Sequence, residues 1–374
     1  MDKHEAHVII IGGGAAGLSA AGALKSVGVE SLVLDKKHAV GASWSERYDA
    51  LHLHTVRRYS GLAYYPIPKK YPRYMTKDQF ASYLRDYADH FALDLVPACN
   101  VLRIVRNSDF RIETSQETWR ARIVVVATGH FGHPIRPAWP GRTDFAGELI
   151  HSVDYRNPDP FVAKRVLVVG AGNSGAEIAA TLAASDTEHV AISIRTPPPV
   201  VPRDFLGMPV QVFGQLLAGL PPRIADGIGK SIAGVATGDL TRYGLAPAAW
   251  QPFSAKRIPI IDVGFIKQLK RGRLHVRPNI ARLSRDGVMY DDDSEDPFDV
   301  VIMATGFRPG IEDLLGIEGL LRPDGLPRFP SGDPTSVPGL YFMGYTESHR
   351  GHLFEANRDS KRLAKAIQSY LQHK

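Results

Sequence analysis

Short apolar runs that end in glycine are the most regular pattern along this chain, and they predict buried strands. The run VIII at 8–11 leads directly into GGGAAG at 12–17, and the small, apolar residues that follow predict a helix that Gly28 ends. The run SLVL at 31–34 predicts the next strand, and Asp35 follows it. This order of strand, glycine turn, helix and strand is a βαβ unit of ordinary size.

The same order of elements recurs in the middle of the chain. The run RVLVV at 165–169 leads into GAGNSG at 170–175, which opens an alanine-rich helix. The run VAISI at 190–194 then predicts a strand that ends at Arg195. A glycine turn between a strand and a helix is where parallel α/β sheets bind nucleotides, so the chain is predicted to carry two nucleotide-binding units.

Two further apolar runs end in Ala-Thr-Gly, at 127–129 and at 304–306, and each is expected to place a small turn beside a nucleotide site. The stretch 134–160 is rich in Pro and Gly and reads as a connection between domains. Because an Ala-Thr-Gly strand and a last helix follow the second unit, we expect the chain to return to the first domain. The predicted fold class is α/β with two Rossmann-like domains, the first over 1–157 and 286–374 and the second, inserted in it, over 158–285.

Composition narrows the classes of function. The 374 residues include one cysteine, Cys99, which excludes an internal disulfide or CxxC centre and fits a cytoplasmic protein. No run approaches the roughly 18 apolar residues that span a bilayer, and no export signal is expected. The net charge of +6 comes from scattered Lys and Arg, which favours phosphorylated cofactors over nucleic acid. The pairs His52/His54 and His349/His352 lack the helical HExxH spacing, so no metal site is expected.

The stretch 210–235 is apolar and contains many glycines. We expect a helical lid or packing layer there, and contact with a membrane surface is the alternative. No integral membrane association is predicted. No coiled-coil pattern is present either, so a homodimer stays open.

Each glycine of the first turn has its own physical reason. Gly12 permits the tight bend, Gly14 lets the backbone approach a pyrophosphate, and Gly17 lets the helix pack close to the strand. The start of the helix then offers free N–H groups to the phosphates. Asp35, about twenty residues further on, suits the two hydroxyls of a ribose.

The second turn differs at the position that distinguishes cofactors. Arg195 stands where an NAD site usually carries an acid, and a guanidinium can pair with a 2′-phosphate through two hydrogen bonds, which favours NADPH over NADH. Arg203, after a proline run, could join it or could be an ordinary solvated charge. Two dinucleotide sites without a CxxC predict hydride transfer from NADPH to FAD and delivery of electrons to an acceptor such as oxygen.

A motif just ahead of the second turn makes a family resemblance specific. The pattern F-x-G-x3-H-x3-Y at 145–155 resembles the fingerprint of class B flavin-containing monooxygenases. The resemblance covers nearly the whole chain and is strongest for the YUCCA-type branch, with supporting segments GASW at 41–44, YDALHLH at 48–54 and ATGF at 304–307. It implies that NADPH reduces FAD, that oxygen adds at flavin C4a, and that retained NADP⁺ protects the hydroperoxyflavin until it attacks the substrate.

The resemblance also assigns roles to individual residues. Many members of the family place an asparagine near flavin C4a, and this chain has His54 in the aligned place, as YUCCA-type sequences do. His54 is therefore the candidate catalytic residue, and a packed structural histidine is the alternative. Gly344 is expected to approach FAD through its backbone only, because Tyr345 replaces the acid common after it. The residues assigned to cofactor binding are Gly12, Gly14, Ala15, Ala16, Gly17, Asp35, Lys36, Ser43, Trp44, His54, Val101, Ala127, Thr128, Gly129, Gly170, Gly172, Asn173, Ser174, Gly175, Arg195, Arg203, Ala304, Thr305, Gly306 and Gly344.

The fingerprint has a purely structural interpretation as well. In that interpretation Phe145 and Tyr155 fill a core, and His151 is merely hydrogen-bonded.

The leading functional hypothesis is an FAD-dependent monooxygenase that uses NADPH and O₂, with FAD on the first domain and NADPH on the inserted one. Its substrate is a small organic molecule, which undergoes N- or S-oxygenation or, if it is an α-keto acid, oxidative decarboxylation. One alternative is an NADPH-dependent flavin reductase or oxidase that releases H₂O₂. Another, from a different class, is a non-catalytic nucleotide-binding protein that senses redox state.

Overall fold

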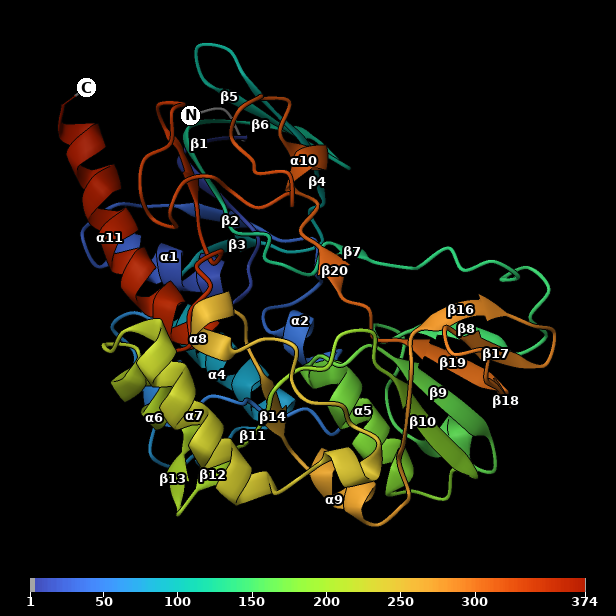
Figure 1. Ribbon diagram of the computed structural model, residues 1–374. Helices are drawn as coiled ribbons and strands as arrows, with labels where there is room; N and C mark the ends of the chain where they lie inside the picture. The colour runs from blue at the N-terminus through green and yellow to red at the C-terminus, as the bar shows by residue number, and fades with distance from the viewer. Residues whose placement is uncertain (1–3, 374) are drawn as a thin grey trace. The chain divides into compact units, whose positions relative to one another are not determined.

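The computed structural model describes residues 4–373, which divide into two compact α/β units (Figure 1). Unit 1 comprises the described parts of Met1–Glu46, Thr55–His133 and Phe307–Lys374. Unit 2 comprises Arg47–His54 and Pro134–Gly306. Unit 2 therefore interrupts unit 1 along the sequence.

Unit 1 is built on a sheet of strand order β3-β2-β1-β6-β5-β4, in which β21 also pairs with β6. The central strands are parallel, and β4 and β5 continue from β6 as an antiparallel meander. The strands are β1 (Glu5–Ile11), β2 (Leu32–Leu34), β3 (Asp94–Val96), β4 (Val101–Arg106), β5 (Phe110–Thr114), β6 (Thr118–Val126) and β21 (Leu340–Phe342).

The side-chain alternation along β1 decides what covers each face of this sheet. Val8 and Ile10 belong to the core that includes residues of α1 and α11, whereas Ile9 and Ile11 belong to the core that β4 and β5 line. Both faces are covered, which explains why these four positions are all apolar. The helices of unit 1 are α1 (Ala15–Lys25), α2 (Ala42–Ser45), α3 (Arg57–Ser60), α4 (Lys77–His90), α10 (Ile311–Leu314) and α11 (His352–Gln372).

The helix α4 begins with a capping box. The Thr76 hydroxyl accepts a hydrogen bond from the Gln79 backbone N–H at 3.2 Å, and the Gln79 side-chain oxygen accepts one from the Thr76 N–H at 3.0 Å. This fixes where α4 starts, and α4 in turn packs against α2.

Unit 2 repeats the parallel arrangement with strand order β15-β10-β9-β19-β8. Val166 and Val168 of β9 belong to the core that includes α5, while Leu167 and Val169 belong to the core lined by the antiparallel β16–β18 sheet. Its elements are β8 (Glu148–His151), β9 (Arg165–Val169), α5 (Asn173–Ala183), β10 (His189–Ser193), β11 (Val200–Pro202), β14 (Ile260–Asp262), α9 (Phe265–Lys270), β15 (His275–Arg277), β16 (Ile280–Leu283), β17 (Gly287–Tyr290), β18 (Glu295–Pro297) and β19 (Val300–Met303).

The second Ala-Thr-Gly strand lies in unit 2 and not in the returning part of unit 1. Strand β19 pairs with β9 on one side and β8 on the other. Both β8 and β19 fall outside the range 158–285 expected for the inserted domain, so unit 2 is wider than that range. The last helix does belong to unit 1, where α11 packs against α1.

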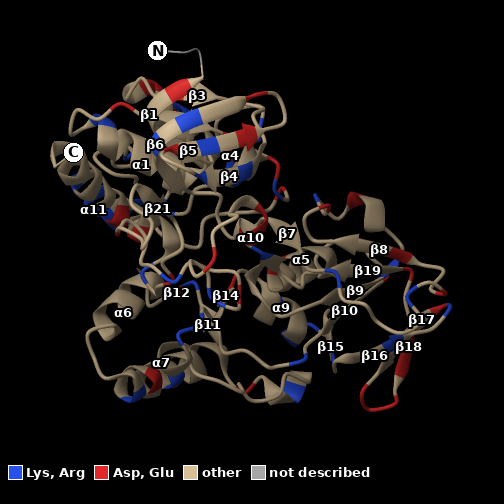
Figure 2. Cartoon of the chain, turned by 90° about the horizontal axis from the view of Figure 1, so that it is seen from above, with Lys and Arg blue, Asp and Glu red and all other residues tan. Residues whose placement is uncertain are grey.

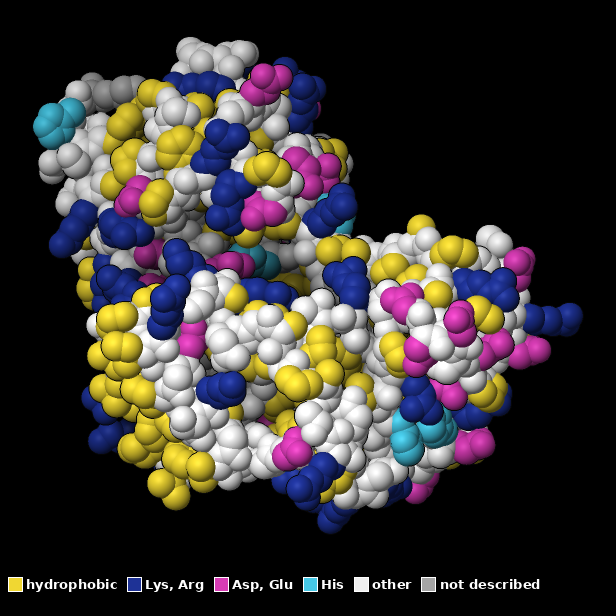
Figure 3. Space-filling view, viewed as in Figure 1, with side chains coloured by type: hydrophobic (Ala, Val, Ile, Leu, Met, Phe, Trp, Pro, Cys, Tyr) yellow, Lys and Arg dark blue, Asp and Glu magenta, His cyan; other side chains and the backbone are white. Residues whose placement is uncertain are grey.

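The apolar stretch 210–235 forms most of α6 (Val210–Leu217) and α7 (Pro222–Thr237), next to the hairpin β12 (Asp204–Phe205) and β13 (Met208–Pro209) and the short α8 (Pro252–Ala255). Hydrophobic side chains gather on the surface over α6 and α7 (Figure 3). They include the exposed Leu216, Leu220, Ile224 and Val235. Within 4–373, no helix is long and apolar enough to cross a membrane.

Charged residues are mixed over both units. Lys and Arg are scattered, with Asp and Glu between them, rather than gathered along one helix or strand (Figure 2).

Candidate cofactor and active site

The first glycine turn joins β1 to α1 in unit 1. Gly12 has a φ of +106°, and a Cβ on it would lie 2.5 Å from the carbonyl oxygen of Ala127. A Cβ on Gly17 would collide with the carbonyl oxygen of Gly12. A Cβ on Gly14, by contrast, would meet nothing within 4 Å. Gly12 and Gly17 therefore pack too closely against the protein backbone to carry a side chain. Gly14 has free space beside it, where the expected pyrophosphate needs room.

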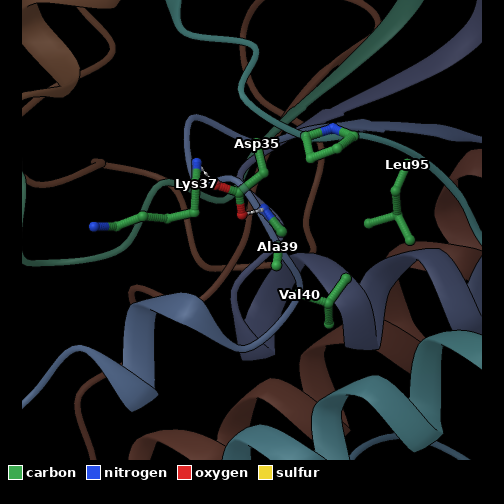
Figure 4. Close-up of a pocket in the computed structure, with 7 residues that line it drawn as sticks. Asp35, Lys37, Ala39, Val40 and Leu95 are labelled. Atoms are coloured by element: carbon green, nitrogen blue, oxygen red, sulfur yellow. Dashed lines mark hydrogen bonds between the residues drawn. The ribbon is translucent and has the colours of Figure 1, made fainter.

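Asp35 lines a pocket beside this turn, between Lys37 and Leu95 in the view of Figure 4. Its carboxylate accepts hydrogen bonds from the backbone N–H groups of Gly13 at 2.6 Å and Lys37 at 2.7 Å. The remaining lining is largely apolar, so the pocket combines a hydrogen-bond acceptor with a wall suited to a flat ring. The lining residues are Gly13, Asp35, Lys37, Ala39, Val40, Leu95 and Pro97.

Sequence reasoning found only part of this pocket. It named Lys36, which is exposed, whereas Lys37 lines the pocket. It also named Val101, which is 7% exposed and lies in the core of unit 1. Leu95 and Pro97 come from β3 and the residue after it, and β2–β3 pairing, which no local pattern encodes, brings them beside Asp35.

The first Ala-Thr-Gly turn meets the C-terminal turn of unit 1. The Thr128 hydroxyl lies 2.9 Å from the Tyr345 hydroxyl, and His130 Nε2 lies 3.1 Å from the carbonyl oxygen of Gly344. Burial raises the pKa of Tyr345 to about 12, so this residue is a neutral substitute for the acid common at its position. A Cβ on Gly344 would lie 2.6 Å from the Cβ of Ala16, which places this turn against the start of α1.

Trp44 lies on the short helix α2, next to Ser43. Its ring packs edge-on against Phe80 of α4, with 4.7 Å between ring centroids. The pair fixes one face of the indole by packing, and the side chain is only half-buried.

The second glycine turn joins β9 to α5 in unit 2 and has the same backbone geometry. Gly170 has a φ of +110°, and a Cβ on it would lie 2.5 Å from the carbonyl oxygen of Ala304. A Cβ on Gly175 would collide with the carbonyl oxygen of Gly170, and one on Gly172 would meet nothing within 4 Å. In both units, therefore, the alanine carbonyl of an Ala-Thr-Gly turn lies against the first glycine of the glycine turn.

Two arginines follow strands of unit 2 that the sequence places after the second turn. Arg195 follows β10, is exposed, and makes no hydrogen bond or ion pair with any described residue. Arg203 follows β11, and its Nε lies 3.8 Å from a carboxylate oxygen of Asp204. Arg195 is therefore available to an anion, while Arg203 already has an acidic neighbour.

Two residues assigned to cofactor binding already hydrogen-bond within unit 2. The Asn173 side-chain oxygen accepts from the Ile261 N–H at 2.7 Å, and its amide donates to the Pro259 carbonyl at 3.4 Å. The Thr305 hydroxyl donates to the Ile135 carbonyl at 2.5 Å. These side chains fix the turn in place, and Ser174 stays exposed at the start of α5.

The fingerprint residues fit their structural interpretation. The Val153 N–H donates to His151 Nδ1 at 3.1 Å, so His151 Nε2 carries the proton and donates to the Gly306 carbonyl at 3.2 Å. Burial lowers the pKa of His151, which keeps the ring neutral. Phe145 packs in the core beside β16 and β17, and Tyr155 packs in the core beside α5.

His54 lies in the short segment Arg47–His54 of unit 2. Its Nε2 is 3.1 Å from Oε1 of Glu177, and the Tyr48 hydroxyl donates to Oε2 of the same carboxylate. Glu177 sits in the second turn of α5, and its side chain is 7% exposed. Sequence reasoning missed Glu177, although an acid among the apolar residues of a helix predicted to be buried is a readable signal.

Cys99 is buried, and burial raises the pKa of its thiol. Among the residues from His4 to His373, no three His, Cys, Asp or Glu side chains are grouped as metal ligands.

Comparison with known proteins places the chain in a family. The model of the family described as pyridine nucleotide-disulphide oxidoreductase matches residues 9–200. An Arabidopsis thaliana protein described as probable indole-3-pyruvate monooxygenase YUCCA1 is 32% identical over 96% of this chain and 89% of its own. The indole-3-pyruvate monooxygenase YUCCA6 of the same plant is 33% identical over 96% and 89%.

Solved structures agree with this assignment. A flavin-containing monooxygenase from Stenotrophomonas maltophilia is 25% identical, with a TM-score of 0.74 over 98% of this chain and 99% of that chain. Cyclohexanone monooxygenase in an open crystal structure, 18% identical over 98% of this chain and 88% of that chain, shares the fold with a TM-score of 0.73. The family resemblance expected from the sequence is confirmed: the chain belongs to the class B flavin-containing monooxygenase family and is a flavin-dependent monooxygenase of that family.

Proposed function

We propose that this protein is a monooxygenase that holds FAD on unit 1 and NADPH on unit 2. The observation that carries the proposal is the pair of glycine turns with opposite charge beside them. Asp35 stands beside the first turn. Arg195, whose guanidinium is unpaired, follows β10, the next strand after the second turn and its helix α5.

Unit 1 has the features that FAD requires. The first turn is open at Gly14, where backbone N–H groups at the start of α1 can face the diphosphate. The Asp35 carboxylate, already oriented by two backbone N–H groups, can accept hydrogen bonds from the hydroxyls of the adenosine ribose. The apolar residues of its pocket then provide a wall for the adenine ring.

Unit 2 has the features that NADPH requires. The second turn is open at Gly172, and Arg195 is free to pair with the 2′-phosphate. Because the Asn173 and Thr305 side chains already bond within unit 2, we assign the pyrophosphate contacts mainly to the backbone of the turn and to Ser174. Arg203 takes a secondary role.

The cofactors would supply hydride transfer and oxygen activation, and the protein would bind, orient and exclude water. His54 is the residue we assign to the reacting end of the nucleotide, since its Nδ1 is buried and has no hydrogen-bond partner among the described residues. The relatives are indole-3-pyruvate monooxygenases, and indole-3-pyruvate is an α-keto acid. We therefore infer that α-keto acids with an apolar side chain are the first substrates to test, ahead of amines and sulfides.

The decisive experiment measures NADPH, peroxide and product together. Purified protein is mixed with NADPH in air, with and without each keto acid, amine or sulfide, and NADPH consumed is compared with H₂O₂ and oxygenated product formed. We expect one substrate class to lower the peroxide yield while product rises in equal amount. Full conversion of NADPH to peroxide with every compound would instead identify an oxidase.

A second measurement separates the non-catalytic alternative. Under nitrogen, NADPH should bleach the yellow flavin, and air should restore the colour. A flavin that NADPH leaves oxidised would support a nucleotide-binding sensor.

A further inference from the structure

A buried carboxylate in unit 2 connects the family fingerprint to His54. Tyr155, the last residue of the fingerprint, packs beside Tyr48 with 6.3 Å between ring centroids. Tyr48 donates its hydroxyl hydrogen bond to Glu177, and Glu177 contacts His54. Glu177 is part of α5, the helix that begins at the second glycine turn, and Tyr48 and Tyr155 belong to the core that this helix lines.

The two oxygens of Glu177 each have one partner. Burial, and then the neighbouring carboxylate, raise the pKa of Tyr48 well above its usual range, so the phenol keeps its proton and is the donor to Oε2. A carboxylate can only accept, so the His54 Nε2 that lies 3.1 Å from Oε1 must carry a hydrogen.

In the neutral form of the imidazole, this assignment also decides the chemistry of the other ring nitrogen. In a neutral imidazole with a proton on Nε2, Nδ1 is a lone-pair acceptor. His54 Nδ1 is buried and has no hydrogen-bond partner among the described residues. A buried acceptor normally has a donor, so this atom calls for an N–H or O–H group from a bound molecule.

We propose that Glu177 is a positioning residue that holds His54 with Nδ1 as an acceptor for the carboxamide N–H of the nicotinamide. This rests on the proposed NADPH site of unit 2. The carboxamide is the only N–H donor on the nicotinamide ring system, and the same helix α5 starts at the turn assigned to the pyrophosphate.

Equilibrium binding of three nucleotides to the holoenzyme tests the proposal. NADP⁺ has the carboxamide; its 3-acetylpyridine analogue replaces the carboxamide NH₂ with a methyl group; and 2′-phospho-ADP-ribose lacks the ring. We expect the wild-type protein to bind NADP⁺ about 10-fold more tightly than the acetylpyridine analogue, the value of about one hydrogen bond. An equal affinity for the two would overturn the proposal.

Glu177→Gln is the informative variant because it keeps the size of the side chain. If its amide donates to His54 Nε2, the ring proton moves to Nδ1, which then no longer accepts. The preference for NADP⁺ over the acetylpyridine analogue should fall to about twofold or less, while affinity for 2′-phospho-ADP-ribose stays the same. A preference that survives in Glu177→Gln would contradict the role of Glu177.

Two further variants complete the design. Tyr48→Phe is the matched control, because it removes the other donor to Glu177 and leaves the contact with His54, so the preference should persist. His54→Ala should remove the preference by itself, which gives the same answer if Glu177→Gln does not fold. A failure of 2′-phospho-ADP-ribose to bind any form would refute the NADPH site itself, and thereby be distinguished from a failure of Glu177.

Discussion

The two glycine turns of this molecule have nearly the same backbone and different chemistry. Gly12 and Gly170 have φ values of +106° and +110°, and each lies against the carbonyl oxygen of the alanine in an Ala-Thr-Gly turn. The side chains beyond the turns differ: unit 1 has an acid tied to the backbone, and unit 2 has an unpaired arginine. In the proposed function, the shared backbone geometry binds a nucleotide at each turn, and one side chain after the second strand determines which nucleotide is preferred.

The middle residue of each turn also differs, and this difference follows from the difference between Asp35 and Arg195. The middle residue of the first turn is Gly13, and a Cβ there would lie 2.6 Å from Oδ2 of Asp35. Its counterpart in unit 2 is Ala171. No carboxylate follows β10, so the methyl group of Ala171 has room. The difference between GGG in the first turn and GAG in the second therefore goes with the difference between Asp35 and Arg195.

The largest effect is expected where both turns press against the protein. Gly12→Ala and Gly170→Ala each force a side chain into a positive φ and a 2.5 Å approach to a carbonyl oxygen, which should cost about 3 kcal/mol of unfolding free energy or more. Denaturant unfolding and flavin content per chain measure this. Gly28→Ala is the control, since its φ is +75° with no atom nearby, and it should cost about 1 kcal/mol. A mild effect at one turn and a severe one at the other would break the comparison.

Arg195→Ala tests the basic half of the comparison. Loss of a charge-assisted pair with the 2′-phosphate should raise KM for NADPH about 10- to 100-fold and leave KM for NADH within about twofold. Arg203→Ala should have a smaller effect, because Asp204 already lies beside it. Steady-state kinetics with both nucleotides checks this, and equal losses for NADPH and NADH would refute the assignment.

Asp35→Asn tests the acidic half. The amide has one acceptor oxygen where the carboxylate uses two for Gly13 and Lys37, so we expect FAD to dissociate about 10-fold more readily. Release of FAD on dilution, followed by its fluorescence, gives the dissociation constant. Lys36→Ala is the control and should change nothing, since Lys36 is exposed outside the pocket. A large loss in that control would restore the role the sequence assigned to Lys36.

Ala171→Gly should have the smallest effect. Removing a methyl group from an unstrained turn costs about 0.5–1 kcal/mol, mainly because the unfolded chain gains freedom. Thermal unfolding should show this small shift, with KM for NADPH unchanged. A loss of more than about 2 kcal/mol of unfolding free energy would mean that the methyl group makes important packing contacts. The explanation given for the difference between GGG and GAG would then be wrong.

The features that could be predicted from the sequence are those that residues close together in the chain determine. Both glycine turns and the strands and helices around them were predicted because apolar periodicity and turn residues are local signals. The sheet to which residues 300–303 belong could not be read in this way, because the two Ala-Thr-Gly strands look alike and only pairing with β8 and β9 separates them.

The side-chain partners were the other limit. Asn173 bonds to residues near position 260, and Thr305 bonds to Ile135, so their hydrogen bonds depend on contacts that no sequence window contains. The same holds for His54, whose partner Glu177 lies on a helix far along the chain. The family resemblance indicated that these positions matter, and the tertiary structure shows which of their side chains already have partners within the protein.

The interruption of unit 1 has a consequence for biosynthesis. Every residue of unit 2 has been synthesised once Gly306 is made, whereas β6 of unit 1 still lacks its neighbour β21, and α1 lacks α11. Unit 2 can therefore fold first. The sheet of unit 1 keeps an unpaired strand edge on β6 until β21 is made. Nascent chains of this protein should depend on chaperones chiefly for unit 1.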